Sequence, residues 1–374
     1  MHSLKLINPD GRSLTLYSTQ PIAAGLTAPS PFPEPQHANP HLRWHPLRGE
    51  WVTYAAFLQN RIYQPPPEYN PLAPMRDPAH PTEMPRSEYD IAVFDNRFPS
   101  LSLEARDPPA LTVPTAPAQG HCEVVVFTQD PLASLGALPL ARIELLLQVW
   151  GERTVRLGAH PQIRYVLPFE NRGAEVGVSL HHPHGQIYAY PVVPPVPARM
   201  LAQEAEHLLQ HGASLLCELA RTEAAHGERV LYLGEHAIAF VPPCARDPYE
   251  GWVMPTAPTR DFAALGTAQR ADLARAQDGA AQVRAPVGAA VPLPDGVVPG
   301  AHRRRSASRN PDSRPVFPAV SQSRPPQVPG RDRTGRRPVR HGCAARVERA
   351  RTAAGRCQRG ARMSAPPSSA EGTC

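Results

Sequence analysis

The segment HHPHGQ brings three histidines within four positions, and these residues are the best suited in the chain to do chemistry. They are His181, His182 and His184. Three interpretations are open: a metal site, a nucleophilic histidine, or a loop without chemistry. On a strand, alternate residues share a face, so His182 and His184 could both reach one ion. A zinc site needs three or four ligands, however, and no other clear ligand cluster is evident in the patterned part of the sequence.

The nucleophilic interpretation draws support from the residues around His184. Pro183 stiffens the backbone before the histidine, Gly185 permits close backbone approach, and Gln186 offers an amide donor. Histidine nitrogen is a competent nucleophile toward phosphorus, because a phosphoramidate intermediate splits one hard displacement into two easier ones. The segment therefore has the parts that covalent catalysis at a phosphorus atom requires.

The surrounding sequence predicts the elements that must position this cluster. Apolar runs predict strands at 49–57, 89–101, 121–131 and 163–171, and apolar spacing predicts helices at 138–158 and along 196–227. Residues 235–276 repeat the order strand, loop, strand, helix of residues 89–145. We therefore expect an α+β fold of two similar tandem domains, each an antiparallel sheet with packed helices.

The last part of the chain differs sharply in composition. Residues 295–374 hold 17 arginines and 5 acidic residues, and no Leu, Ile, Tyr, Trp or Lys. Such a segment cannot bury enough surface to offset its chain entropy, which predicts a disordered tail. The same composition is typical of GC-rich coding DNA read in a shifted frame. A basic arm that binds nucleic acid is the third interpretation of this tail.

Charge, cysteines and hydropathy exclude several classes of protein. The net charge of the whole chain is +6, so the residues before the arginine-rich tail are net acidic and show no nucleic-acid footprint. The six cysteines form no C-x-x-C motif, which argues against a disulfide scaffold or a cysteine-rich zinc site. No apolar run reaches the roughly 18 residues that cross a bilayer, and no signal peptide is evident. We expect a cytoplasmic protein without a membrane partner.

The stretch FENRGAEVGVSLHHPHGQIYAYP at 169–191 resembles the active-site segment of the galactose-1-phosphate uridylyltransferase family, a branch of the histidine-triad superfamily. The family pattern runs F-E-N-[KR]-G, a few residues, G-x-S, and then H-P-H-G-Q-I-[WY]-A. Nearly every fixed position is met. The Ser-Asn-Pro that commonly precedes the family's histidines is replaced here by Ser-Leu-His.

Weaker matches extend the resemblance over about residues 40–280. They are GEWV at 49–52, QNRIYQP at 59–65 and DNRFPSL at 95–101. The resemblance implies two tandem histidine-triad-like domains. These are an N-terminal domain with the HPHGQ site (1–194) and an incomplete C-terminal domain (195–294), and the disordered or frameshifted tail (295–374) follows them.

By this resemblance, the chain exchanges UMP between UDP-glucose and galactose 1-phosphate. His184 would attack the α-phosphorus of UDP-glucose and form a uridylyl-histidine. The carbonyl of His182 would hold the far nitrogen of His184, and Gln186 would donate to the phosphoryl oxygens. The other expected substrate-binding residues are Arg61, Asn96, Arg97, Asn171, Gly177 and Ser179. The alternatives are another histidine-triad nucleotidyltransferase or hydrolase, and a truncated inactive copy.

The sequence departs from the family at an expected metal site. Many members hold zinc through a C-P-x-C pair and the histidine that matches His182, whereas this chain has Asn70 and Ala73 in the cysteine places. Neither residue can replace a thiolate as a tight ligand, so we expect that zinc site to be lost and predict no metal. The resemblance also implies a homodimer, and we expect no nucleic-acid partner.

Overall fold

The computed structural model describes six parts of the chain: residues 1–56, 69–172, 180–246, 250–282, 293–297 and 319–321. Residues 1–326 form one compact unit, and all contacts discussed below lie within it. The second unit, residues 327–374, lies outside the described residues. Among the helices of the described residues, none is long and apolar enough to cross a membrane.

The described elements are short strands with four α-helices. The helices are α1 (Leu140–Gly158), α2 (Pro195–His211), α3 (Leu215–His226) and α4 (Thr267–Gln282), with 3-10 turns η2 (Leu135–Ala137) and η4 (Phe262–Ala264). The strands are β1 (His2–Ile7), β2 (Ser13–Ser18), β3 (His41–His45), β4 (Glu50–Tyr54), β5 (Ile91–Asp95), β6 (Thr115–Pro117), β7 (His121–Val126), β8 (Tyr165–Arg172), β9 (His184–Tyr190), β10 (Val230–Leu233), β11 (Ala237–Phe240), β12 (Trp252–Pro255), β13 (Leu293–Val297) and β14 (Ala319–Ser321).

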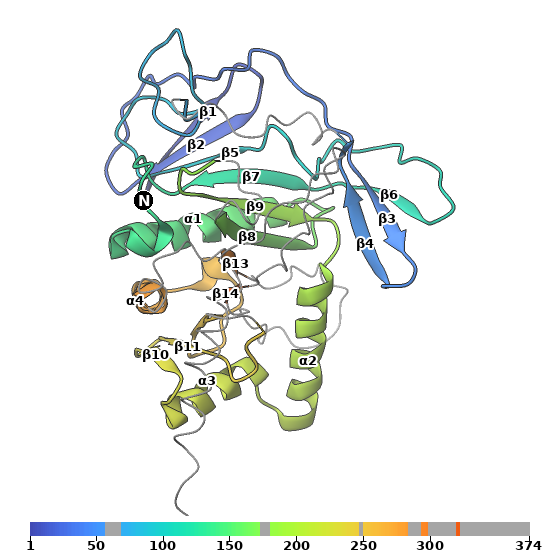
Figure 1. Ribbon diagram of the computed structural model, residues 1–374, viewed down its shortest axis with the longest axis vertical. Coiled ribbons are helices and arrows are strands. Elements are labelled where there is room, and N and C mark those ends of the chain that lie inside the picture. Colours follow the sequence, from blue (N-terminus) through green and yellow to red (C-terminus); the bar gives the residue numbers. More distant parts are fainter. Residues whose placement is uncertain (57–68, 173–179, 247–249, 283–292, 298–318, 322–374) are drawn as a thin grey trace, which may run out of the picture. The chain divides into compact units, whose positions relative to one another are not determined.

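Eleven of the described strands form one sheet in the order β1-β2-β5-β7-β9-β8-β13-β14-β12-β11-β10 (Figure 1). Neighbouring strands in this sheet pair antiparallel throughout. The predicted α+β class with antiparallel strands is confirmed. The pairing of β7 with β9 sets Val126 opposite His184 and Val124 opposite Gln186, which places both candidate residues on one face.

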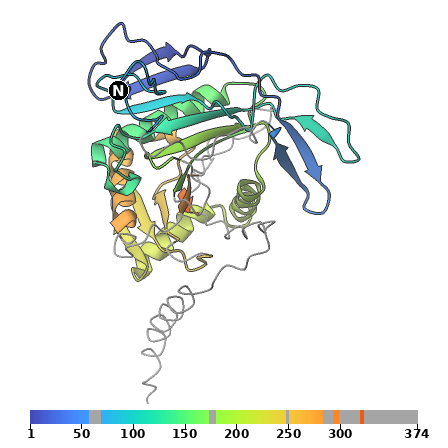
Figure 2. The ribbon, with the colours of Figure 1, turned by 45° about the horizontal axis from the view of Figure 1, so that its top comes forward.

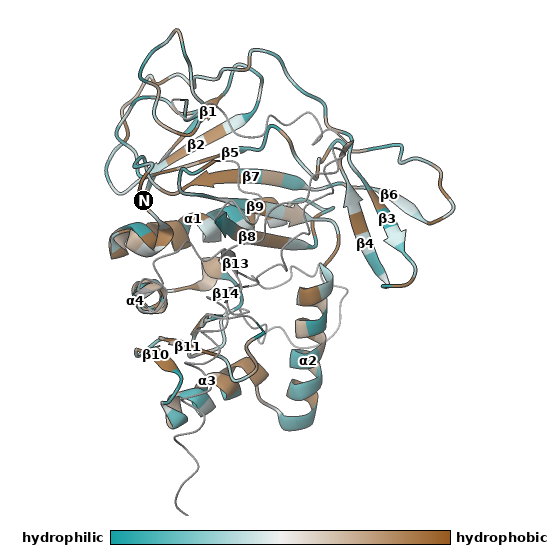
Figure 3. Ribbon diagram, in the orientation of Figure 1, coloured by the Kyte–Doolittle hydropathy of each residue, from teal (hydrophilic) through white to brown (hydrophobic). Residues whose placement is uncertain are grey.

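The other face of the sheet is covered by α1, whose apolar residues follow the predicted helical spacing. Ile143, Leu146 and Trp150 of α1 are buried in one core with Val125 and Ile187 of the strands. Hydrophobic residues mark the same strands in Figure 3. On its second side α1 meets η4, where the ring of Trp150 lies 5.6 Å from that of Phe262. This double coverage explains why α1 is buried well beyond a single stripe.

The loop at residues 69–84 covers the face that carries His184. Leu72 and Met84 of the loop are buried with Leu16, Phe94 and Val126 of the sheet. Backbone hydrogen bonds stiffen the loop, including one of 2.9 Å from Glu83 N to the carbonyl of Pro71. The loop is therefore a fixed part of the surroundings of β9.

A second sheet of three strands, β4-β3-β6, lies beside the ends of β7 and β9 (Figure 2). It contacts the main sheet through a small core in which Leu42 of β3 is buried with Leu101 and Cys122. Trp44 and Trp51 pack edge to face on neighbouring strands, with ring centroids 5.4 Å apart. The predicted strand at 49–57 is the described β4, and its last residue lies outside the described part.

Several predicted elements differ from those observed. The helical stretch at 196–227 is two helices, because Gly212 adopts the left-handed conformation (φ 69°) that ends α2. Ser214 then caps α3 by accepting a hydrogen bond from Cys217 N. Strands β1, β2 and β3 were not predicted from residues 1–88. Their proline-rich surroundings conceal runs of only five or six residues, which pairing with neighbouring strands stabilises.

The prediction that residues 295–374 are disordered is wrong for two short segments. Strand β13 pairs with β8, and β14 pairs with both β13 and β12. Backbone pairing needs no apolar side chains, which is why composition failed to signal it. For the other residues of the tail, which lie outside the described part, disorder stays a prediction.

The repeat seen in the sequence corresponds to a repeated order of elements. Strands β5 and β7 precede η2 and α1, and strands β11 and β12 precede η4 and α4. Helices α1 and α4 lie against each other. The turn η2 also packs closely on α4, because a Cβ added at Gly136 would come within 2.7 Å of Cβ of Ala281. Both sets of strands belong to one continuous sheet.

A buried ion pair joins α1 to the centre of the sheet. Arg153 donates from Nε to Glu123 at 3.0 Å and makes a second, shorter bond through its terminal nitrogen. The side chains are only 8% and 2% exposed. Burial opposes the charge on Arg153, but the attraction and hydrogen bonds of Glu123 outweigh it and raise the guanidinium pKa.

Replacing Arg153 with methionine should lower the free energy of unfolding by about 3–5 kcal/mol, because Glu123 would keep a buried charge without its partner. Urea denaturation measures the change. Arg156→Met is the matched control, since Arg156 lies on the same helix and its pair with Glu152 is exposed. Equal stability of the two variants would contradict the assignment of Arg153.

His121 lies beside this pair, and its titration should make the stability of the protein depend on pH. Burial lowers its pKa, but the hydrogen bond and charge of Asp95 and the charge of Glu123 outweigh burial, so the folded pKa lies above the ordinary 6.5. Folding therefore favours the protonated form of His121. Its contribution to the free energy of unfolding is full below about pH 6.5 and is lost as pH rises through the folded pKa.

The stability difference between the wild type and His121→Gln should therefore be largest near about pH 6 and smaller near about pH 9. Unfolding in urea across that range measures it. His37→Gln serves as the control, because the His37 side chain is 83% exposed. A difference that grows with pH would refute the protonated His121–Asp95 pair.

Candidate active site

His184 begins strand β9, and the hydrogen bond at its ring sets the tautomer. Its Nδ1 lies 2.7 Å from the carbonyl oxygen of His182. A carbonyl can only accept, so Nδ1 carries the proton and the lone pair of the neutral ring resides on Nε2. The side chain is partly buried on the face that carries Gln186. The contact expected between the His182 carbonyl and the far nitrogen of His184 is present.

The His182 ring is buried and has a partner at each nitrogen. The residue is 2% exposed, its Nε2 lies 2.7 Å from the carbonyl oxygen of Thr128, and its Nδ1 lies 3.0 Å from Nδ2 of Asn70. Burial lowers the pKa of His182, although the Thr128 carbonyl acts in the opposite sense. The ring is therefore neutral near neutral pH and is held between a loop and the end of β7.

The three neighbouring histidines thus occupy different environments. His181 is exposed, His182 is buried and His184 is partly buried. Within the described residues, the group of three carboxylate and imidazole ligands close enough for an ion is Asp95, His121 and Glu123. That group lies on the α1 face, where it forms the ion pairs described above. The joint metal site considered for His182 and His184 has no third ligand in the described part.

The side-chain amide of Gln186 has a defined orientation. Phe98 N donates to Oδ1 of Asn96 at 2.9 Å, which turns Nδ2 of Asn96 toward Oε1 of Gln186 at 3.2 Å. Since a backbone N–H can only donate, the orientation of both amides follows. Gln186 therefore presents its NH₂ group as a donor on the face of β9 that carries His184.

Gly185 permits the close packing that places its two neighbours. A Cβ at this position would lie 2.7 Å from Cζ of Phe127 and 2.7 Å from the carbonyl oxygen of Phe169. Both contacts are closer than real Cβ atoms allow, so only glycine fits without displacement. The predicted close backbone approach is thus made by protein atoms on the opposite face.

The structure places three of the six other predicted site residues. Asn171 lies on β8 two residues beyond Phe169, which is paired with Gln186, so it shares the face of that glutamine. Arg97 donates to Asp10 at 2.9 Å, and its guanidinium lies 3.7 Å from the centroid of the Phe32 ring. These contacts give Arg97 a structural role, and its contact with a substrate stays a prediction. The remaining three, Arg61, Gly177 and Ser179, lie outside the described residues.

Comparisons with known proteins show which family this chain resembles. Residues 30–194 match the family model for the N-terminal domain of galactose-1-phosphate uridyl transferase. The chain is 32% identical to the galactose-1-phosphate uridylyltransferase of Haemophilus influenzae over 253 residues, which cover 63% of this chain and 71% of that protein. The chain belongs to the galactose-1-phosphate uridylyltransferase family. The Thermotoga maritima protein of the same name is 38% identical over 220 residues, or 57% of this chain.

A solved uridylyltransferase structure has the same fold as this chain over the part where the two align. It aligns with a TM-score of 0.56 and 30% identity, over 64% of this chain and 73% of that one. The chain spans 66% of the length of the Thermotoga maritima relative and 60% of that from Streptomyces lividans, which is 39% identical. The remaining parts of those relatives have no counterpart in the alignment.

The residues at the family's expected zinc position do not fit zinc. Nδ1 of His182, which would face the ion, accepts a hydrogen bond from the amide of Asn70. An amide nitrogen is no ligand for zinc, and the methyl group of Ala73 offers no donor atom. A hydrogen bond between two protein groups therefore occupies the place where the family would hold the metal.

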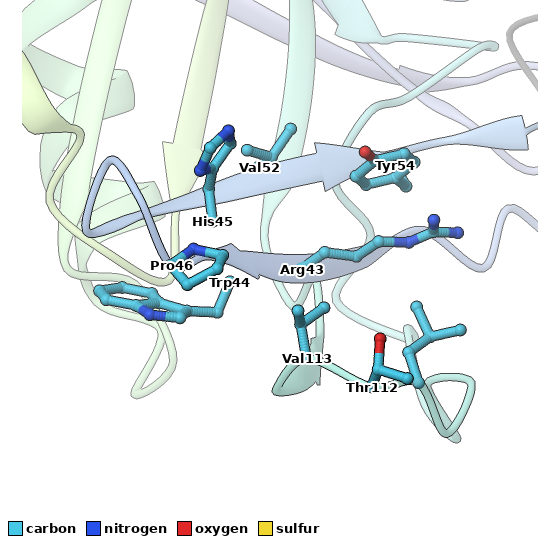
Figure 4. A pocket seen from close by; sticks show the side chains of 9 residues that line it. Arg43, Trp44, His45, Pro46, Val52, Tyr54, Thr112 and Val113 are labelled. Carbon is cyan, nitrogen blue, oxygen red and sulfur yellow. The ribbon is translucent and has the colours of Figure 1, made fainter.

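A hollow of about 340 Å³ lies on the three-stranded sheet, away from these residues (Figure 4). Its lining includes Arg43, Trp44 and Tyr54, and the guanidinium of Arg43 lies 3.8 Å from the centroid of the Tyr54 ring. It contains none of the predicted site residues described here, and we assign it no part in the chemistry.

The sequence did not reveal the groups that orient the site. Thr128 and Phe98 act through backbone atoms, which carry no side-chain signal. The sequence presents Asn70 only as the replacement of a metal ligand, although it is a hydrogen-bond partner of His182. Only the pairing of an amide with a buried imidazole in three dimensions identifies it.

Proposed function

We propose that this chain is a UDP-glucose–hexose-1-phosphate uridylyltransferase that works through a uridylyl-histidine. The observation that carries the proposal is the hydrogen bond from Nδ1 of His184 to the His182 carbonyl. It leaves the nucleophilic lone pair on Nε2 without the need for a general base. Membership of the family supplies the substrate class, UDP-glucose and galactose 1-phosphate.

In the first displacement, Nε2 of His184 forms a bond to the α-phosphorus of UDP-glucose. The bond from that phosphorus to the bridging oxygen breaks, and glucose 1-phosphate leaves with the electron pair. In the second, a phosphate oxygen of galactose 1-phosphate attacks the same phosphorus. The phosphorus–nitrogen bond then breaks, its electron pair returns to Nε2, and UDP-galactose is released.

Two neighbouring groups stabilise the charges that develop. The imidazole becomes cationic when Nε2 bonds to phosphorus, and the carbonyl of His182 at Nδ1 stabilises that charge. The NH₂ group of Gln186, aimed by Asn96, donates to the phosphoryl oxygens where negative charge accumulates. Both dipoles are positioned before the reaction, so little reorganisation is needed.

The proposal is tested by mixing the full chain with UDP-glucose and galactose 1-phosphate and following products by ³¹P NMR. We expect glucose 1-phosphate and UDP-galactose in equal amounts, with the parallel double-reciprocal plots of ping-pong kinetics. Release of UMP without transfer would favour the alternative histidine-triad hydrolase. Absence of any turnover by a folded chain would indicate an inactive copy.

Finer features of the family belong to the same proposal. The repeated order of strands and helix supports an origin of the two halves, residues 1–194 and 195–294, as tandem histidine-triad-like domains. Asn70 and Ala73 stand where the family has its cysteine ligands, which supports the proposal that this chain works without the family zinc. Homodimer formation rests on the family resemblance, and analytical ultracentrifugation of the purified chain would measure it.

A further inference from the structure

The amide of Asn70 connects a stiff loop to the histidine cluster. Leu72 N donates to Oδ1 of Asn70 at 3.1 Å, and Nδ2 of Asn70 lies 3.0 Å from Nδ1 of His182. The loop is closed further by a bond of 3.1 Å from Ala73 N to the Asn70 carbonyl, and Leu72 is buried in the core beneath. The amide is therefore held at a fixed position against the ring.

Every proton in this chain of bonds is assigned by a backbone group at its end. Leu72 N–H can only donate, so Oδ1 of Asn70 faces it and the NH₂ group faces His182. The Thr128 carbonyl can only accept, so Nε2 of His182 carries the ring proton. Nδ1 of a neutral His182 then has to accept, and the amide of Asn70 supplies the donor it needs.

The same bonds fix the peptide that orients the nucleophile. The backbone from His182 to His184 is anchored at the His182 ring and by Phe127 N, which donates to the Pro183 carbonyl at 3.1 Å. The carbonyl of His182 belongs to this anchored segment and accepts from Nδ1 of His184. Without Asn70, a ring nitrogen that is buried would lose its partner and the ring could turn or shift.

We propose that Asn70 is a positioning residue, whose amide donates to His182 and so holds the His182 carbonyl where it fixes the tautomer of His184. The inference rests on the proposed function for its effect on rate, but the tautomer is observable in the absence of any substrate. It assigns to a hydrogen bond, rather than to a metal, the task of holding this histidine in the present chain.

A spectroscopic experiment tests the proposal with the full chain. Histidine ¹⁵N NMR should show Nδ1–H for His184 and Nε2–H for His182 in the wild type, assigned with His184→Asn and His182→Asn. Asn70→Ala should weaken or abolish the Nδ1–H signal of His184. It should also lower kcat about tenfold or more, with a smaller change in KM, because the reacting atom is misplaced.

Asn70→Asp separates positioning from a simple loop cap. The carboxylate still accepts from Leu72 N but can only accept at His182, so Nδ1 of His182 must take up a proton. The proposal therefore requires an Nδ1–H signal on His182 that the wild type lacks. Asn39→Ala is the control, because it removes a bond of 2.9 Å from Arg106 N in an exposed loop and should change neither signal nor rate. Circular dichroism confirms that each variant is folded.

The outcomes distinguish this inference from the proposed function. Retention of the His184 Nδ1–H signal in Asn70→Ala would overturn the positioning role, as would Asn70→Asp without an Nδ1–H signal on His182, or a wild type without Nδ1–H on His184. Wild-type signals that depend on Asn70, in a chain without turnover, would support positioning and contradict only the proposed activity.

Discussion

His184→Asn should abolish covalent labelling of the protein by UDP-glucose that carries a radiolabel in its uridylyl group. The wild type should form an adduct that is labile to acid and stable to base, as expected of a phosphoramidate. Asparagine has no nitrogen lone pair able to attack phosphorus, so both labelling and turnover should fall by roughly 10⁴-fold or more. Labelling is measured by acid-free filtration and located by mass spectrometry of peptides.

Two neighbouring histidines provide matched controls for this experiment. His181→Asn should keep full labelling, because the His181 side chain is exposed. His182→Asn should weaken labelling, because it removes the buried ring beside the backbone carbonyl that holds Nδ1 of His184. Equal labelling of the His184 variant and the wild type would eliminate His184 as the nucleophile.

Gln186→Glu should lower kcat by about 10²–10³-fold, the usual effect of removing one donor to the charge of a transition state. The glutamate keeps the size of the side chain and an oxygen for Asn96, but it replaces the NH₂ group with an acceptor that repels phosphoryl oxygens. The rate of uridylyl transfer to the protein, measured in a single turnover, should fall together with kcat.

The control for this change is Gln36→Glu, which adds the same charge at an exposed loop position. It should leave kcat within about twofold of the wild type, because exposed charges in water interact weakly. If Gln186→Glu also stayed within that range, the donor for the phosphoryl oxygens would have to be sought elsewhere.

Local pattern was enough to predict the candidate nucleophile and most of the elements around it. Alternation along residues 184–190 places His184 and Gln186 on one face, and the spacing of apolar residues defines α1 closely. Pattern failed where neighbours stabilise a segment that has little preference of its own. Strands β1 and β2, and the short strands β13 and β14, form because adjacent strands supply their hydrogen-bond partners.

By itself, the sequence determined which side chains lie together along β9 and which chemistry they suit, since covalent order and strand geometry act over a few residues. Only the tertiary structure decided how these side chains are oriented. Asn70 is 112 residues from His182, Thr128 is 54 residues from it, and Asn96 is 90 residues from Gln186. A tautomer or an amide orientation depends on partners within about 3 Å, and folding alone brings groups so distant in the chain to that separation.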